Sequence, residues 1–176
     1  MDWSRTYAAH WRVHAVIPST WADGELITGV DSVSVTRDAT GDAPLVDSGT
    51  VTVTNATIPR GYYRVVMIAE QDGEIERVEV ATLELVRTGG SVDHGVPTDK
   101  VEARSVLYPA STYELSPGQY APAGSDGAEY AASLLRLNCV APVQVDGGGF
   151  ALASGVVPEQ GASALDLAWQ VARAGG

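Results

Sequence analysis

The sequence predicts a mainly β domain followed by a small α+β extension. Segments in which polar and apolar residues alternate, as in half-buried strands, dominate the chain up to about residue 108. The pair Asp72-Gly73 separates two of these segments, and Asp-Gly is a strong hairpin signal because glycine accepts the positive φ of the turn. Apolar residues at helical spacing first occur after residue 108. We therefore expect two domains, at 1–108 and 109–176.

The strands are predicted from this alternation and from β-branched residues. Strands are expected at 7–17, 29–37, 49–54, 62–70, 74–86 and 101–107. Turns, loops or linkers are expected at 18–24, 38–44, 55–61 and 88–99. In 7–17, Trp11 and Val13 share one face, and His10 and His14 share the other. A phase slip near Asp31 indicates a bulge in the second strand.

The pattern changes after residue 108. Residues 111–126 are predicted to form an extended, wrapping loop. Helices are expected at 128–138, capped by Ser125 or Asp126, and at 163–173, where Ser163 and Asp166 form an imperfect capping box. A small hairpin is predicted at 143–152, around the glycines 147–149.

The composition is that of a folded, acidic protein. The chain has 176 residues, of which 45% are hydrophobic and 19% charged, so it is long enough to bury a core. Apolar runs are far shorter than the roughly 20 residues of a membrane span, and residues 1–5 do not begin a signal peptide, so we expect synthesis in the cytoplasm and no membrane partner. The formal net charge of −11 disfavours binding to nucleic-acid phosphates, and in the simplest interpretation it only keeps the protein soluble.

No motif indicates an enzyme, and we predict no catalytic, cofactor-binding or metal-binding residue. His10 and His14 would lie about 13 Å apart on one strand, which is too far to chelate one ion. His94 follows Asp93, but no G-x-S-x-G motif supplies a nucleophile for such a pair. Cys139, the single cysteine, has apolar neighbours and is expected to be an inert, buried thiol.

Carboxylates are frequent enough to raise the possibility of glycoside hydrolysis, which needs two acids in one cleft. The candidates are Asp38, Asp42, Asp47, Glu70, Asp72, Glu74 and Glu76. Glu74 and Glu76 flank a tight turn, where exposed charges commonly discourage edge pairing. Asp38 and Asp42 lack the pattern of a calcium loop, although weak calcium binding there stays open as an alternative. The glycines 147–149 lack the pattern of a phosphate-binding loop.

The order of segments resembles the N-terminal half of baseplate hub, or tail hub, proteins of long-tailed phages and related injection machines. The matching segments are W-R-V-H-A-V-I, I-T-G-V-D-S-V-S-V-T-R-D, P-L-V-D-S-G-T-V-T-V, G-Y-Y-R-V-V-M-I-A-E-Q-D-G-E-I-E-R-V-E-V-A-T-L-E-L-V, A-R-S-V-L-Y-P-A and Y-A-P-A-G-S-D. The resemblance covers most of the chain through loose patterns. It implies a tail-tube-like β-barrel or sandwich and a non-enzymatic subunit that adapts the sixfold tube to a threefold tip.

The resemblance implies a structural component of a phage tail tip that joins the tail tube to distal tip proteins. The implied partners are further copies, as a trimer, together with tail-tube, distal-tail and tip or fibre proteins. It also implies a location in the virion tail after assembly in the host cytoplasm, with DNA passing through a lumen. Family members are usually longer and have a second barrel, so a split gene, a shorter hub and a fragment are all open explanations for an end at Gly176.

An alternative function is a β-rich module that binds carbohydrate or a host surface. Trp3, Trp11 and Trp21 lie near the N-terminus, where they could form a platform on which a sugar stacks. Packing in the core or at a subunit interface is the competing explanation for these tryptophans.

Overall fold

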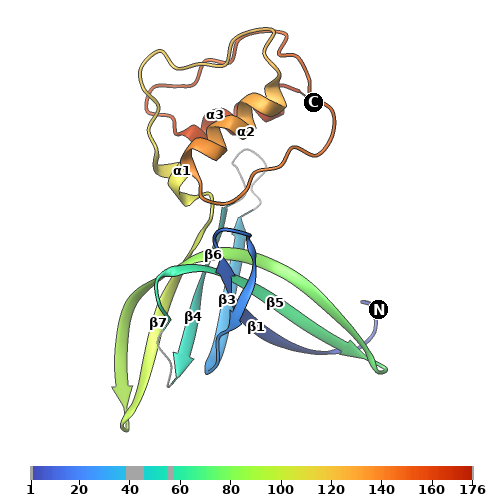
Figure 1. The fold of residues 1–176 in the computed structure, drawn as a ribbon, viewed down its shortest axis with the longest axis vertical. Coiled ribbons are helices and arrows are strands. Elements are labelled where there is room, and N and C mark those ends of the chain that lie inside the picture. Colours follow the sequence, from blue (N-terminus) through green and yellow to red (C-terminus); the bar gives the residue numbers. More distant parts are fainter. Residues whose placement is uncertain (1, 39–45, 55–57, 176) are drawn as a thin grey trace. The chain divides into compact units, whose positions relative to one another are not determined.

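The computed structural model describes residues 2–38, 46–54 and 58–175 (Figure 1). They belong to two compact units, which we describe separately. The first unit comprises Met1–Arg37 and Asp47–Ser105, and the second comprises Asp38–Val46 and Val106–Gly176. The first unit is built from strands and the second contains the helices, so the predicted mainly β fold with a smaller helical part is confirmed.

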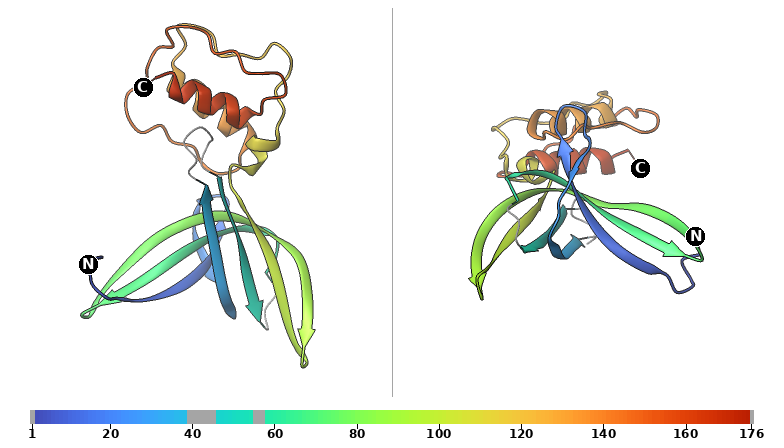
Figure 2. Two further views of the ribbon diagram at one scale, coloured as in Figure 1. Left: turned by 180° about the vertical axis from the view of Figure 1, so that it is seen from behind. Right: turned by 60° about the horizontal axis from the view of Figure 1, so that its bottom comes forward.

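The first unit is one antiparallel sheet. Its strands are β1 (Ala8–Ile17), β2 (Ala22–Leu26), β3 (Val30–Asp38), β4 (Val46–Thr54), β5 (Gly61–Gln71), β6 (Glu74–Asp93) and β7 (Val96–Ser105). They form a seven-stranded sheet in the order β2-β1-β5-β6-β7-β4-β3. The sheet curves strongly, as the views in Figures 1 and 2 show.

The two edge strands of this sheet are consecutive in the chain, although within the described ranges no ladder between them closes the sheet into a barrel. The segment 27–29 joins β2 to β3. At its start, the N–H of Ile27 donates to the carbonyl of Val13 in β1 at 2.8 Å. At its end, the carbonyl of Gly29 accepts from the N–H of Thr54 in β4, also at 2.8 Å. The chain therefore crosses from one edge of the curved sheet to the other within a few residues.

The core of the first unit lies on one face of the sheet, as the alternating pattern predicts. The most deeply buried large side chains include Val13, Val51, Val53, Val65, Leu83, Leu85 and Val101. Six strands surround this cluster, because partly buried side chains of β3 pack against the residues from β1, β4, β5, β6 and β7. The predicted strands are thus confirmed as the source of the core.

Two long hairpins extend from the sheet in diverging directions (Figures 1 and 2). In the β5–β6 turn, Asp72 and Gly73 have φ values of 52° and 84°, which confirms the predicted Asp-Gly turn. In the β6–β7 turn, His94 and Gly95 repeat this geometry with φ values of 49° and 83°. The sequence does not predict this second hairpin.

Two segments predicted as loops are strands. The interpretation of 88–99 as a linker is wrong, because β6 continues to Asp93 and pairs with β7 as far as Val96. The glycines at 89 and 90 weaken the local strand signal, but the ladder with β7 supplies hydrogen bonds that no local pattern reveals. The interpretation of 18–24 as a loop is also incomplete, since β2 begins at Ala22 and pairs with β1.

The second unit contains α1 (Tyr108–Thr112), α2 (Gly127–Asn138) and α3 (Ala164–Arg173). The two predicted helices are confirmed, and Asp126 caps α2 by accepting from the N–H of Glu129 at 3.2 Å. Ser163 and Asp166 form a complete capping box at α3. The sequence does not predict α1, where Pro109 stands in the first turn and suits a helix start.

The predicted hairpin at 143–152 is wrong. The segment has no strand, and Ala151 forms only an isolated bridge with Asp126. Phe150 explains this in part, because its ring packs against both Gly127 and Gly175, where an added Cβ would lie 2.3 Å and 2.4 Å from ring carbons. The core of this unit is formed by α2, α3 and buried residues of the connecting segments, which are Ala121, Ala131, Leu134, Leu152, Leu167, Ala168 and Val171.

Candidate functional site

The histidine candidates do not come together in a reactive group. His10 and His14 lie on β1, whereas His94 lies in the β6–β7 turn. Among the described residues, no three or more His, Cys, Asp or Glu side chains are arranged to hold a metal ion. The calcium candidate Asp42 lies outside the described residues, as does most of the predicted loop at 38–44.

In the part of the chain that the structure describes, no helix is long and apolar enough to cross a membrane.

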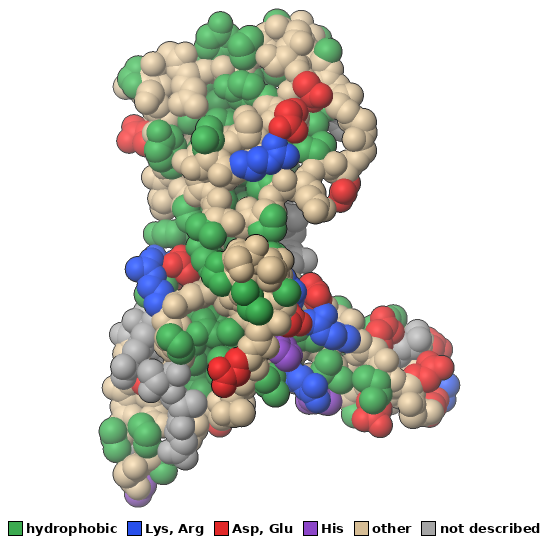
Figure 3. All heavy atoms as spheres, in the orientation of Figure 1, with side chains coloured by type: hydrophobic (Ala, Val, Ile, Leu, Met, Phe, Trp, Pro, Cys, Tyr) green, Lys and Arg blue, Asp and Glu red, His purple; other side chains and the backbone are tan. Residues whose placement is uncertain are grey.

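Of the other acidic candidates, Asp38 ends β3 and Asp47 lies near the start of β4, whereas four lie at the tip of the β5–β6 hairpin. Glu70, Asp72, Glu74 and Glu76 are placed there by the tight turn. Figure 3 shows acidic side chains gathered at this tip. They belong to adjacent positions of two paired strands, which is typical of a solvated hairpin end.

The N-terminal segment is tied to this tip through Gln71, a buried polar residue of β5 with 8% exposure. The side-chain amide of Gln71 donates to the carbonyls of Asp2 and Thr6 at 3.1 and 3.3 Å, and its oxygen accepts from the N–H of Asp2 at 2.9 Å. Arg5 pairs with Asp72 at 3.2 Å. Hydrogen bonds from Ser4 hold the pKa of Asp2 below its usual value. The N-terminal segment is therefore fixed to the hairpin end by hydrogen bonds, and Arg5 compensates one of the negative charges there.

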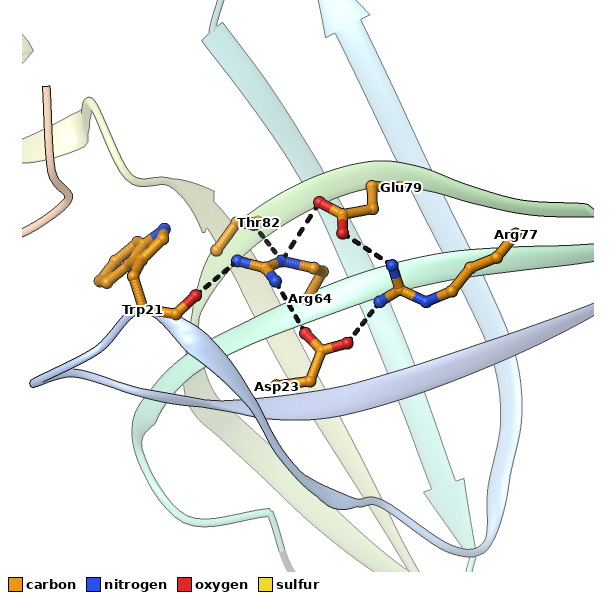
Figure 4. A network of polar contacts seen from close by, with 6 residues as sticks. All are labelled: Trp21, Asp23, Arg64, Arg77, Glu79 and Thr82. Atoms are coloured by element: carbon orange, nitrogen blue, oxygen red, sulfur yellow. Dashed lines mark hydrogen bonds and ion pairs between the residues drawn. The ribbon is translucent and has the colours of Figure 1, made fainter. Parts of the chain in front are cut away.

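A network of charged side chains joins three strands on the first unit (Figure 4). Arg64 of β5 donates to Asp23 of β2 at 2.8 Å and to the carbonyl of Trp21 at 2.9 Å. Arg77 of β6 also pairs with Asp23, and it donates to Glu79 at 2.7 Å. The hydrogen bond with Glu79 raises the pKa of Arg77. Two arginines and two carboxylates thus neutralise one another, which holds β2 against β5 and β6.

The three N-terminal tryptophans have different neighbours. Trp3 packs edge-on against Tyr7, with ring centroids 5.2 Å apart. Trp21 lies against Tyr62 at 5.4 Å. Trp11 stands on β1 directly opposite Met67 of β5. These contacts give each tryptophan a structural partner, and they do not unite the three into one stacking platform.

An apolar row crosses three strands next to the core. We use this name for Trp11, Met67 and Val78, which are paired in register across β1, β5 and β6. Trp11 is 46% exposed although its neighbours on the sheet are apolar. Nearer the tips of the two hairpins, Ile75 and Val92 are 70% and 71% exposed. A contiguous, partly exposed apolar row is typical of a surface that contacts another protein, whereas Ile75 and Val92 are single exposed side chains on different hairpins.

Cys139 is half-buried just after α2. Burial raises the pKa of its thiol, and a hydrogen bond involving the backbone of Ala110 only partly opposes this effect. A raised pKa reduces the thiolate fraction, which is the reactive form. The predicted inert character therefore agrees with the thiol's surroundings, although its burial is partial.

Comparison with known proteins shows that the fold of this chain is similar to solved structures. Neither a protein-family model nor a curated protein matches the sequence. The tail protein from Neisseria meningitidis MC58 is 14% identical, with a TM-score of 0.56 over 97% of this chain and 45% of that chain. The 43 kDa tail protein of prophage MuSo2 from Shewanella oneidensis is 16% identical, with a TM-score of 0.54 over 96% of this chain and 51% of that chain. This chain thus spans about half the length of each, and its fold is similar to that of these two tail proteins.

Proposed function

We propose that the chain is a structural subunit of a phage-type tail. The observation that carries this proposal is the fold similarity to the two tail proteins, which extends over 97% and 96% of the chain and therefore over both units. At identities of 14% and 16% the likeness concerns the fold, so the function is our inference from it. The charged network supports a structural role, because its arginines and carboxylates neutralise one another and stabilise strand packing.

Within the tail, we propose a place in the baseplate hub, between the tail tube and the distal tip proteins. The sheet ends in two edge strands, β2 and β3, and ring assembly is one way in which neighbouring subunits cover such edges. The apolar row and the exposed side chains near the hairpin tips offer contact surfaces for such neighbours. The order of segments in the sequence, which resembles tail hub proteins, supports the same position.

The partners that follow from this position are further copies of the chain, as a trimer, and the tail-tube, distal-tail and tip or fibre proteins. The protein would act in the virion tail without catalysis. A net charge of −11 suits a channel wall past which DNA moves without specific binding. The alternative of a carbohydrate-binding module receives no specific support, because the three tryptophans have separate contacts.

The assembly part of the proposal is tested by light scattering on the purified chain at several concentrations. We expect a trimer that Trp11→Ser weakens, because this change removes the largest side chain of the apolar row. Leu137→Ser is the matched control, since Leu137 is 82% exposed on α2, in the other unit. A monomer at every concentration would contradict self-assembly by this chain alone.

The location is tested separately by immunogold labelling of tail particles made by the genome that encodes the chain. We expect label at the distal end of the tail, where the hub lies. Particles that lack the protein would overturn the proposed function, whatever its oligomeric state in solution.

A further inference from the structure

The second unit contains a pocket that neither the resemblance nor the proposed function explains. It has a volume of about 420 Å³ and is lined by two segments, 114–120 and 157–161. These segments lie far apart in the sequence, on either side of α2 and the following loop. The pocket belongs entirely to the second unit.

Backbone hydrogen bonds join the two segments at each end of the pocket, and the segments lie apart between these two points. At one end, the N–H of Leu115 donates to the carbonyl of Ala162 at 3.1 Å. At the other, Ala121 and Val156 exchange two backbone hydrogen bonds, at 3.0 and 2.9 Å. Within the described second unit, no backbone hydrogen bond crosses the pocket between these anchors. The opening is therefore preformed by its frame and does not require a ligand to create it.

The frame is also fixed to the helices. The hydroxyl of Tyr130 on α2 donates to the carbonyl of Tyr120 at 2.8 Å. Next to the first anchor, Glu114 forms a bridge with Ser163, the residue that caps α3. Both helices thus hold the rim of the pocket, which favours a rigid binding site over a fluctuating loop.

The walls combine apolar surface with unpaired negative charge. Tyr120 is 49% exposed and Val157 is 74% exposed, and no lysine or arginine lines the pocket. The carboxylate of Glu114 reaches toward the opposite segment, where its Oε1 lies 3.9 Å from the position of a Cβ built on Gly161. Both Glu114 and Glu159 are exposed residues, and among the described residues neither has an ion-pair or hydrogen-bond partner for its side chain.

These carboxylates differ from others that face arginines in the same protein. Glu129 on α2 pairs with Arg136, and Glu84 on β6 pairs with Arg60 at 2.9 Å. Glu114 and Glu159 instead flank an apolar pocket without a counter-charge. Their negative potential is available to a cation that enters from outside.

We propose that this pocket binds an arginine side chain presented by a partner protein. The aliphatic stem of the arginine would lie along Val157 and its guanidinium against the ring of Tyr120, an arrangement that attracts cations to aromatic faces. The planar guanidinium would donate to Glu114 and Glu159, which accept bidentate bonds well. An arginine on the surface of a partner can enter the pocket from its open side, where Tyr120 and Val157 are exposed. The inference does not depend on the proposed tail function.

The probes for the test are the blocked tripeptide Ac-Ala-Arg-Ala-NH₂, its citrulline analogue and free argininamide. Citrulline has nearly the same shape as arginine but lacks the charge. Each probe is titrated into the ¹⁵N-labelled full chain, and amide shifts are followed by NMR. We expect the arginine tripeptide to shift residues in 114–120 and 157–161, and to bind about tenfold or more tightly than the citrulline analogue, since charge-assisted hydrogen bonds are lost.

The variant that tests the pocket is Glu114→Gln combined with Glu159→Gln, which keeps the shape and removes both charges. We expect it to weaken arginine-tripeptide binding about tenfold or more, whereas the control Asp146→Asn, an exposed carboxylate outside the pocket, leaves binding unchanged. The NMR spectrum of each variant shows directly whether the second unit remains folded.

The proposal is overturned by equal binding of the arginine and citrulline tripeptides, by unchanged binding to the double variant, or by shifts confined to other residues. Argininamide that binds more tightly than the tripeptide would show that the pocket takes a free cation and would overturn the assignment to a partner protein. None of these outcomes bears on tail location, so the two proposals can fail independently.

Discussion

At the scale of single residues, Arg64 makes the most connections in the described charged network. Its side chain is only 12% exposed, and its guanidinium contacts Asp23, Thr82 and the carbonyl of Trp21. Arg5, by contrast, has a 64% exposed side chain that pairs with an equally solvated Asp72. The same type of residue therefore has a structural task at one position and a weak surface contact at the other.

We predict that Arg64→Ala destabilises the protein, whereas Arg5→Ala hardly does. Removing Arg64 leaves Asp23 with one arginine and removes the hydrogen bond to the carbonyl of Trp21, so the expected loss is about 1–3 kcal/mol of unfolding free energy. For the exposed pair of Arg5 the expected loss is below about 1 kcal/mol. Urea unfolding followed by tryptophan fluorescence measures both. Equal losses in the two variants would mean that the network contributes no more than an ordinary surface ion pair.

At the scale of elements, the sheet depends on close contact between neighbouring strands. β4 lies between β7 and β3, and at Gly49 its backbone lies close to that of Ser34 and Val35 in β3. A Cβ added to Gly49 would lie 2.0 Å from the carbonyl oxygen of Ser34, a distance that only movement of the backbone could relieve. Because β3 is an edge strand, such movement would loosen the pairing of β3 with β4 at this edge of the sheet.

We predict that Gly49→Ala destabilises the sheet by about 1–3 kcal/mol through overpacking. Gly89→Ala in β6 is the matched control, since an added Cβ there meets no heavy atom within 4 Å. The control should change the unfolding free energy by no more than about 0.5 kcal/mol. Circular dichroism during chemical unfolding compares the two. A Gly49→Ala protein as stable as the control would indicate that β3 can shift freely beside β4.

At the scale of the whole molecule, charge and apolar surface act in opposite directions on self-association. The net charge of −11 makes copies repel one another at long range. The apolar row and the exposed apolar residues near the hairpin tips favour contact at short range. Salt separates the two effects, because it shortens the reach of charge repulsion and leaves apolar attraction largely intact.

We predict that self-association strengthens when the salt concentration rises from 0.1 to 1 M. Over this range the Debye length falls from about 10 Å to about 3 Å, so repulsion between acidic copies is screened. Sedimentation velocity at several protein concentrations measures the change. Weaker association at high salt would contradict this view, because it would show that attraction between opposite charges holds the copies together.

The elements that the sequence predicted well depend on neighbours along the chain. The Asp72-Gly73 turn and the caps of α2 and α3 all appear in the structure. In each case the residues that interact lie within a few positions of one another, so their chemistry is readable before folding. The β6–β7 hairpin is not predicted from the sequence, because Gly89 and Gly90 weaken the local strand signal. The strand is stabilised there by hydrogen bonds to β7, which no local pattern indicates.

Local patterns in the sequence are enough to predict the class of fold: alternating segments form a sheet, an Asp-Gly turn forms the first hairpin, and helical spacing forms two helices. Which residues meet across the chain depends instead on long-range contacts. The tertiary structure brought Asp23 to Arg64 and Arg77, aligned Trp11 with Met67 and Val78, and opened a pocket between 114–120 and 157–161. The physical reason is that strand register and the separation of paired segments arise from long-range hydrogen bonds and packing, which leave no periodic signal in any local stretch of sequence.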